Sequence, residues 1–229
     1  KADLVVCLTI SDLREISTFG VSPKKIRIVP NAIDTDLFVP DSKKDDSLIV
    51  WVGRFVNEKG IEYLIKASKI VQAENKDIRF LLIGYGPLKA KMQKLATDIG
   101  LSHNFLAFED KMDRQEIANV LSKAAIFVFP SLKEGLPLAL LEAMASGDAV
   151  VASDIPGVNE VIQNEVNGLL FEPKDPKKIA STIIRLINDS HLRKKLAINA
   201  RKSVMAKFSV NTMLAALDSV YEEARRKHN

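Results

Sequence analysis

The chain has 229 residues, of which 47% are hydrophobic and 27% charged, which is typical of a globular protein and excludes a disordered one. Its formal net charge at neutral pH is only +4. The single cysteine, Cys7, excludes an internal disulfide and suggests a reducing compartment, so we expect a cytoplasmic protein. No apolar run approaches the roughly 20 residues of a membrane span, and no signal peptide is visible.

Much of the excess of positive over negative charge lies near the C-terminus, for example at Arg193, Lys195, Lys202 and Arg225. A membrane surface or a nucleic acid could bind such a cluster, but a solvated helix face explains it more simply. We therefore expect no nucleic-acid partner.

The predicted elements begin at once: residues 2–10 read as a strand, with no Met before them. Independent domains rarely open on a strand that looks buried, so we expect a piece of a longer protein. The pattern predicts a strand Leu4–Thr9, a helix Ser11–Phe19 capped by Ser11, and a strand Lys25–Val29. The polar stretch Pro40–Ser47 is the best linker candidate.

From Leu48 onward, strand-like and helical runs alternate. The predicted strands are Leu48–Val52, Ile78–Ile83, Phe105–Phe108, Ala125–Phe129, Ala149–Ala152 and Gly168–Phe171. The predicted helices are Ile61–Glu74, Leu88–Ile99, Arg114–Ser122, Pro137–Ser146, a short one at Val158–Gln163, Ile179–Asn188, His191–Lys207, and Val210–Arg226 capped by Ser209. Several strands are apolar throughout, which indicates a sheet covered on both faces. We therefore predict an α/β fold with a doubly wound parallel sheet, whose ligands bind at the carboxyl ends of the strands.

The helical run Pro137–Ser146 carries one charged residue, Glu142, among apolar and small residues. Such a helix is normally buried, so the carboxylate must be buried with it or face a cleft. A second acid, Glu134, lies in the turn that leads into the helix. Pro137 suits the first helical position, and the free amides that follow it form the positive end of the helix dipole, which favours phosphate. This segment therefore predicts a nucleotide-sugar site, with the diphosphate on the amides and the hydroxyl groups on the two acids.

Other strand ends carry weaker signals. Gly53 and Arg54 end one strand and Lys59 opens the next helix, which places two cations where they could neutralise a diphosphate, although solvated surface charges explain them equally well. Gly84 and Gly86 follow the second strand and could admit a ligand, but a structural turn is favoured.

Phe108 and Glu109 end the third strand and could flank a base, or they could simply anchor a loop. The three histidines show no ligand spacing, so no metal site and no cofactor are expected. The full dinucleotide fingerprint is absent, which disfavours NAD.

Four segments, VGRFVNEKG, LLIGYGP, FVFPSLKEGLPLALLEAMASGDAVVAS and DIPGVNEVI, resemble the retaining glycosyltransferases of family 4, also called glycosyl transferases group 1. The third segment holds the family's Glu-x7-Glu pattern as Glu134 and Glu142. The resemblance implies the GT-B architecture, in which two Rossmann-like domains face a cleft and the C-terminal one binds the nucleotide-sugar donor. This chain looks like that C-terminal half.

The resemblance also implies a division of the chain. Residues 1–39 would be a remnant of the acceptor domain, 40–47 the hinge, 48–208 the donor-binding domain, and 209–229 a helix that crosses back to the acceptor domain. The rest of that acceptor domain would be missing, and membrane association would arise only through it, with the full-length protein peripheral at the membrane.

By matching position, Arg54 and Lys59 would hold the diphosphate, Glu134 the transferred sugar and Glu142 the ribose. Arg54, Lys59 and Glu134 would be the catalytic residues, in a metal-free transfer that retains anomeric configuration. Further donor-binding groups would be Gly53, Gly84, Gly86, Phe108, Glu109 and the amides of Gly135, Leu136, Leu138 and Ala139. Asp148 departs from the family, which usually has Pro there.

Three functions stay open from sequence. The first is the donor-binding portion of a glycosyltransferase using a UDP-, GDP- or ADP-linked sugar, inactive or weakly active alone. The second is a stand-alone nucleotide-sugar binding or regulatory module without turnover. The third is a related two-domain enzyme such as a phosphorylase or an epimerase; no lysine suited to pyridoxal phosphate is evident.

Overall fold

A computed structural model describes residues 2–226, so the ends of the predicted segments 1–39 and 209–229 lie outside the described residues. Its main feature is a sheet of six strands, all parallel, in the order β5-β4-β3-β6-β7-β8. The strands are β3 (Asp45–Val52), β4 (Arg79–Ile83), β5 (Leu106–Glu109), β6 (Ala124–Phe129), β7 (Ala149–Ser153) and β8 (Leu169–Phe171). The predicted α/β doubly wound parallel sheet is confirmed.

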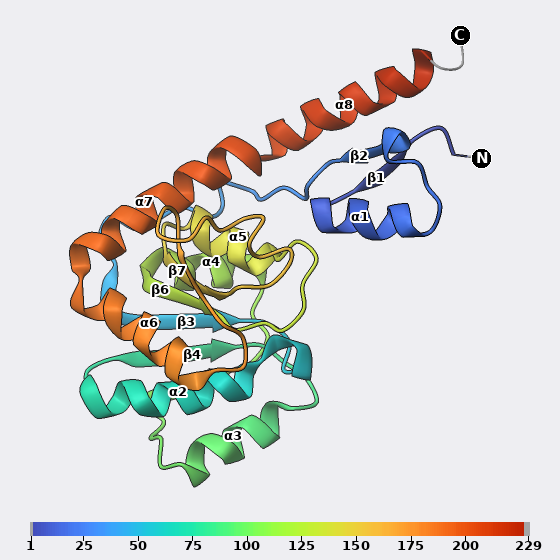
Figure 1. The fold of residues 1–229 in the computed structure, drawn as a ribbon. Coiled ribbons are helices and arrows are strands. Elements are labelled where there is room, and N and C mark those ends of the chain that lie inside the picture. The colour runs from blue at the N-terminus through green and yellow to red at the C-terminus, as the bar shows by residue number, and fades with distance from the viewer. Residues whose placement is uncertain (1, 227–229) are drawn as a thin grey trace.

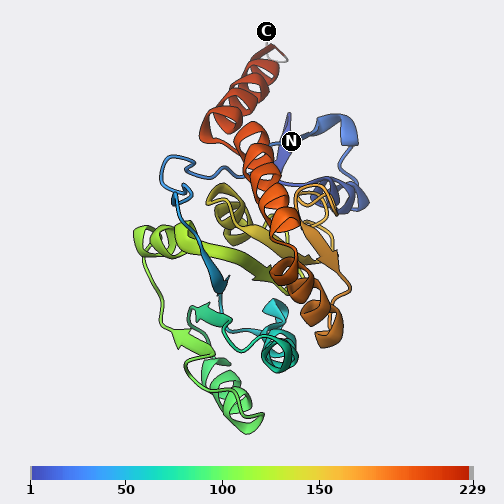
Figure 2. The ribbon, with the colours of Figure 1, turned by 90° about the vertical axis from the view of Figure 1, so that its left-hand side faces the viewer.

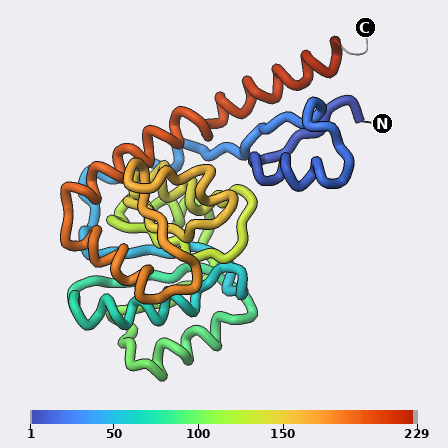
Figure 3. The backbone as a smooth tube through the Cα atoms, in the orientation of Figure 1, coloured from blue at the N-terminus to red at the C-terminus, as the bar shows by residue number. Residues whose placement is uncertain are grey.

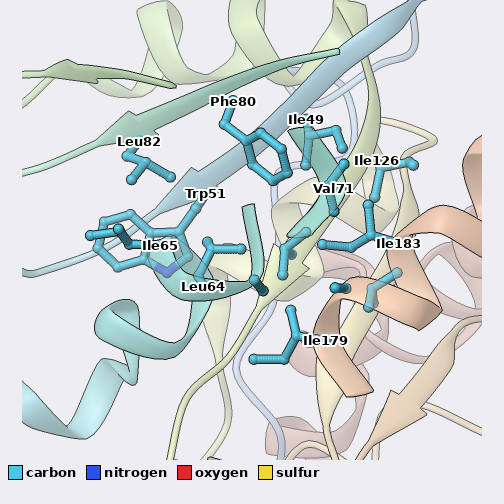
Figure 4. Close-up of a cluster of buried hydrophobic side chains, with 14 of the residues drawn as sticks. Ile49, Trp51, Leu64, Ile65, Val71, Phe80, Leu82, Ile126, Ile179 and Ile183 are labelled. Carbon is cyan, nitrogen blue, oxygen red and sulfur yellow. The ribbon is translucent and has the colours of Figure 1, made fainter. Parts of the chain in front are cut away.

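Helices cover both faces of the sheet (Figure 1). They are α2 (Ile61–Glu74), α3 (Lys89–Asp98), α4 (Arg114–Lys123), α5 (Leu138–Ala145), α6 (Pro176–Asn188) and α7 (Ser190–Lys207). One hydrophobic cluster joins the sheet to α2, α3 and α6, and a second joins it to α4 and α5. Alternate residues of β3 enter different clusters, Ile49 and Trp51 the first and Val50 the second, because successive side chains of a strand point to opposite faces. Figure 4 shows side chains of α2 and α6 meeting those of β3 and β4 in the first cluster.

A small unit precedes the sheet. In it β1 (Val5–Cys7) pairs in parallel with β2 (Ile26–Ile28), and α1 (Ile10–Thr18) and the short 3-10 helix η1 (Pro23–Lys25) connect them. The cap of α1 was predicted wrongly: Thr9 caps it, with its hydroxyl accepting from the Asp12 amide and Asp12 bonding back. Ser11 cannot do this, because α1 begins at Ile10 and Ser11 is already its second residue.

The Glu160 carboxylate holds this unit against the main body. It accepts hydrogen bonds from the amides of Ile10 and Ser11 and from the Ser11 hydroxyl, at 2.7, 2.9 and 2.6 Å. Burial raises the pKa of Glu160, but these hydrogen bonds outweigh it and leave the pKa below its ordinary value. The first turn of α1 is therefore stabilised by an acid 150 residues away in sequence.

The last helix, α8 (Val210–Arg226), leaves the main body and runs beside the N-terminal unit (Figures 1 and 2). The backbone trace shows the end of α8 and the N-terminal unit at the same end of the molecule (Figure 3). Arg27 of β2 and Glu223 of α8 form an ion pair, with Nη2 2.5 Å from Oε1. The Ser209 hydroxyl accepts from the Thr212 amide, as its predicted capping role requires.

Other boundaries differ from expectation. β3 begins at Asp45, inside the stretch predicted as a linker, because Asp45 pairs with Ala124 of β6. Residues 158–161 form turns and 162–163 no regular structure, in place of the predicted short helix. Pro137 caps α5 with extended backbone instead of occupying its first turn. Within residues 2–226, no helix combines the length and the apolar composition needed to cross a membrane.

Candidate functional site

The candidate site lies where the strand order reverses. β3 and β6 are neighbours in the sheet, although β4 and β5 separate them in sequence. Ligands of doubly wound sheets bind outside the carboxyl ends of such a strand pair. The loop after β3 carries Lys59, at the end of the 3-10 helix η2 (Asn57–Lys59), and the loop after β6 carries Glu134.

Lys59 and Glu134 form an ion pair at this edge. The Lys59 ammonium donates to Glu134 Oε1 at 2.6 Å and lies 5.5 Å from the centroid of the Phe129 ring. The two side chains are only 24% and 11% exposed. Sequence reasoning selected both residues but not their contact with each other. One of the three ammonium hydrogens is used by Glu134, so two stay available to a ligand.

The two loops are joined through their backbones. The Leu132 amide donates to the Glu58 carbonyl at 2.7 Å. Gly60 has a left-handed backbone (φ +59°), and a Cβ there would lie 2.1 Å from the Pro130 carbonyl oxygen. The contact between Lys59 and Glu134 therefore depends on a close approach that only glycine permits.

The loop after β7 supports the Glu134 turn from the other side. Gly157 has φ +82°, and a Cβ on it would lie 1.9 Å from the carbonyl oxygen of Gly135. A Cβ on Gly135 itself would meet nothing within 4 Å. The turn is thus packed on one side and open to solvent on the other, where a ligand can approach.

The first turn of α5 follows this open turn. Within the described residues, no protein group accepts a hydrogen bond from the amides of Gly135, Leu136, Leu138 or Ala139. The first amides of a helix have no partner inside it and lie at the positive end of its dipole. Pro137, the cap, has no amide hydrogen to donate. The structure therefore offers an anion a set of unpaired donors beside the Lys59–Glu134 pair.

Glu142 lies farther along α5 among buried apolar neighbours and is 15% exposed. Desolvation raises its pKa to about 7, although the positive charge of Arg114 lowers it. Arg114 Nη2 lies 3.9 Å from Glu142 Oε1, and within residues 2–226 the carboxylate accepts no hydrogen bond. An acid without a hydrogen-bonding partner in an apolar helix is costly to maintain for stability alone, which favours a binding role.

Arg114 was missed from sequence. It is the first residue of α4, after the capping Asp113, and no motif contains it. The available signal was electrostatic: a cation in the first turn of a helix opposes the helix dipole, so its presence calls for another partner.

Arg54 is exposed and forms no ion pair with any described residue. It is therefore free to bind an anion, but its predicted contact with a diphosphate stays a prediction.

The glycines after β3 and β4 face protein backbone or side chains. A Cβ on Gly84 would lie 1.8 Å from the Gly53 carbonyl oxygen, and one on Gly86 would lie 2.7 Å from the Phe55 backbone. A Cβ on Gly53 would lie 2.9 Å from the Trp51 ring. These glycines let the two loops pack together, as expected of glycines in structural turns. Their contact with a donor stays a prediction.

Phe108 packs against Phe55, with ring centroids 5.9 Å apart, and Glu109 points to solvent. The Lys89 ammonium donates to the Glu109 carbonyl oxygen and to Asp110 Oδ1. Phe108 thus anchors this loop, and a contact of Phe108 or Glu109 with a base stays a prediction. Within residues 2–226, no cluster of three or more His, Cys, Asp or Glu could hold a metal ion.

The family model of glycosyl transferases group 1 matches residues 32–203. The chain is 34% identical over 225 residues to the uncharacterized glycosyltransferase MJ1607 of Methanocaldococcus jannaschii, covering 91% of this chain and 56% of that protein. It is 29% identical to the UDP-Gal:alpha-D-GlcNAc-diphosphoundecaprenol alpha-1,3-galactosyltransferase of Escherichia coli, covering 90% of this chain and 56% of that protein.

A solved structure, the C-terminal domain of a glycosyl transferase group 1 family protein (LpcC) from Francisella tularensis, superposes with a TM-score of 0.70 at 29% identity. The match covers 78% of this chain and 99% of that domain. The chain spans about half the length of the curated relatives it matches.

Proposed function

Because the chain belongs to the glycosyl transferases group 1 family, we propose that it is the donor-binding portion of a retaining glycosyltransferase that uses a nucleotide-diphosphate sugar. The observation that carries this proposal is the Lys59–Glu134 pair, which lies beside the unpaired amides of α5. Glu142 of the same helix supplies a second acid without a hydrogen-bonding partner.

In the proposed arrangement the diphosphate binds at the first turn of α5, with Lys59 and the exposed Arg54 as its cations. Negative charge grows on the diphosphate as the glycosidic bond breaks. Groups already fixed in place stabilise that charge without reorganisation, which is the main electrostatic contribution to such a reaction. Lys59 is fixed by Glu134 at 2.6 Å and by its position near the Phe129 ring.

Glu134 would bind hydroxyl groups of the transferred sugar with its second carboxylate oxygen, since Oε1 already accepts from Lys59. Glu142 would bind the ribose hydroxyls. Neither acid is assigned a covalent role, and we propose that the transfer needs no metal or organic cofactor.

The E. coli relative is named for UDP-Gal, which supports a nucleotide sugar as donor without deciding among UDP, GDP and ADP. The match to a C-terminal domain supports the division proposed from sequence: residues 1–39 and 209–229 belong to the acceptor side and residues 48–208 bind the donor. The ion pair between Arg27 and Glu223 agrees with a last helix that crosses back. The acceptor domain would be the partner, in a cytoplasmic enzyme peripheral at the membrane, and the chain alone would transfer little.

The test is a thermal-shift panel of UDP-, GDP- and ADP-sugars, followed by calorimetry with the best binder. A donor at about 100 times its Kd should stabilise the native state by about 2.7 kcal/mol. Lys59→Ala should weaken binding by about 1 to 3 kcal/mol, because it removes a charge-assisted hydrogen bond. Lys178→Ala, which changes an exposed lysine of α6, is the matched control.

Absence of a shift with every nucleotide sugar would defeat the proposal. Equal affinity of the Lys59→Ala variant and the unmodified chain would remove Lys59 from the site. A full-length parent that binds donor but transfers no sugar to any acceptor would favour the stand-alone binding module.

A further inference from the structure

We propose that Arg114 is a positioning residue for the nucleoside side of the donor site: braced on Phe38, it presents Glu142 to the ribose as a carboxylate. This inference rests on the proposed function. It concerns a residue outside the four segments that carry the family resemblance.

The Arg114 side chain is 62% exposed, and its guanidinium lies over an aromatic ring. Its Cζ lies 5.6 Å from the centroid of the Phe38 ring, which is completely buried. Phe38 belongs to the segment that connects the N-terminal unit to β3, and its carbonyl oxygen accepts from Arg201 of α7 at 2.9 Å. The same guanidinium nitrogen of Arg201 donates to the Ala145 carbonyl oxygen at the end of α5. The connecting segment therefore contacts Arg114 directly and is linked through Arg201 to the helix that carries Glu142.

Arg114 is the charged group that acts on Glu142. The elements packed against α5 are α4, α7, β6 and β7, and the two strands carry no charged residue. Arg201 of α7 is occupied at the far end of α5, and Lys59 is paired with Glu134. Of these groups, Arg114 lowers the Glu142 pKa, against the larger opposing effect of desolvation.

The distance between Arg114 and Glu142 suits a positioning residue. At 3.9 Å, Arg114 Nη2 is too far from Glu142 Oε1 for a hydrogen bond, so the arginine adds positive charge without occupying the oxygen lone pairs. Both carboxylate oxygens stay free to accept from the two ribose hydroxyls, which donate more strongly to a charged acceptor. A protonated Glu142 would lose one of these contacts.

The primary experiment is calorimetric titration with UDP, GDP or ADP, whichever binds, between pH 6.5 and 8.5. The chain, Arg114→Met, Glu142→Gln and the double variant are compared. Since desolvation holds the Glu142 pKa near 7, removing the nearby cation raises it further. Arg114→Met should weaken binding about three- to tenfold at pH 7 and have little effect at pH 8.5. Titration of the nucleotide itself affects all variants equally and cancels in the ratio of affinities.

In the Glu142→Gln background, Arg114→Met should change affinity less than twofold, because its effect acts through the carboxylate. Arg14→Met, which changes an exposed arginine of α1, is the matched control and should behave like the unmodified chain at every pH. A loss that is equal at all pH values, or that persists in the Glu142→Gln background, would overturn the proposal in favour of direct contact with the nucleotide. Unchanged affinity would overturn it as well.

A second readout needs no ligand. The carbon-13 shift of the Glu142 carboxyl, followed against pH, should show a higher midpoint in Arg114→Met than in the unmodified chain. If the midpoint rises but no nucleotide binds, the proposed function fails while the electrostatic link stands. If nucleotides bind and the midpoint does not move, the inference about Arg114 alone fails.

Discussion

Replacing Lys44 with Met tests how this fold maintains the buried charge of Asp148, which lies between α5 and β7. Lys44 lies just before β3, and its ammonium donates to Asp148 Oδ1 at 2.5 Å and to the Leu121 and Ala124 carbonyl oxygens. Asp148 precedes β7 and is completely buried, and its second oxygen has no hydrogen-bonding partner. The Lys44→Met variant would leave this carboxylate without its one cation among the described residues.

The structure gives the magnitude. Desolvation raises the pKa of Asp148 from 3.8 to about 7 even though Lys44 lowers it. That difference corresponds to about 4 kcal/mol of native-state stability forfeited above pH 7. Well below pH 3.8 the Asp148 carboxyl is protonated in both the native and the unfolded state, so no stability is lost. Between pH 3.8 and about 7 the loss of stability grows with pH. Without Lys44 the pKa of Asp148 rises further, and protonation of the carboxyl limits the added loss at pH 8, one unit above the native pKa, to about 1.4 kcal/mol. We therefore expect Lys44→Met to lose about 1 kcal/mol more stability at pH 8 than at pH 5.

Urea denaturation at pH 5 and pH 8 measures both values. Lys44→Met combined with Asp148→Leu should recover most of the stability lost at pH 8, because the double change removes the buried charge together with its partner. Lys43→Met, an exposed neighbour, is the control. An equal loss at both pH values, a loss below 1 kcal/mol at pH 8, or a double variant no more stable than Lys44→Met would refute the reasoning.

Three further changes test the site and its supports. Glu142→Ala should weaken binding of whole nucleoside diphosphates by about 1 to 3 kcal/mol, and a calorimetric effect confined to the sugar would argue against ribose. Gly157→Ala should lower both stability and donor affinity, because its Cβ would lie 1.9 Å from the Gly135 oxygen; urea melts and calorimetry check this, and wild-type values would contradict it. Glu160→Gln should speed hydrogen exchange at the amides of Ile10 and Ser11 at pH 7. In the unmodified chain the pKa of Glu160 is lowered, so this contact is lost only as the pH falls below the ordinary Glu pKa. Unchanged exchange rates would show that the carboxylate does not hold α1.

The fold class followed from patterns that are local in sequence. The apolar run of β6, whose six residues are all buried, indicated a strand covered on both faces, and the structure has it in the middle of the sheet. The ends of strands and helices were harder to predict where a contact with another element sets them. The polar residues Asp45 and Asp46 read as linker, yet Asp45 belongs to β3 because it pairs with Ala124. Thr9 rather than Ser11 caps α1, which depends on where the helix begins.

The candidate site shows the same division. Glu134 and Glu142 stood out because acids are unusual beside and inside an apolar helix, a property visible in the sequence. Arg114 did not stand out, since its partners Phe38 and Glu142 come from distant parts of the chain. No neighbour of Gly157 in sequence shows why that position excludes a side chain; its short distance to Gly135 does.

The sequence by itself determined the alternation of strands and helices, the parallel sheet and the two acids before and inside α5, because periodicity, capping and burial preference act over a few neighbouring residues. Tertiary structure alone decided that Lys59 meets Glu134, that Arg114 faces Glu142 and that Lys44 reaches Asp148. Those contacts join loops and helices dozens of residues apart, and their distances depend on how the packed sheet brings the strand ends together.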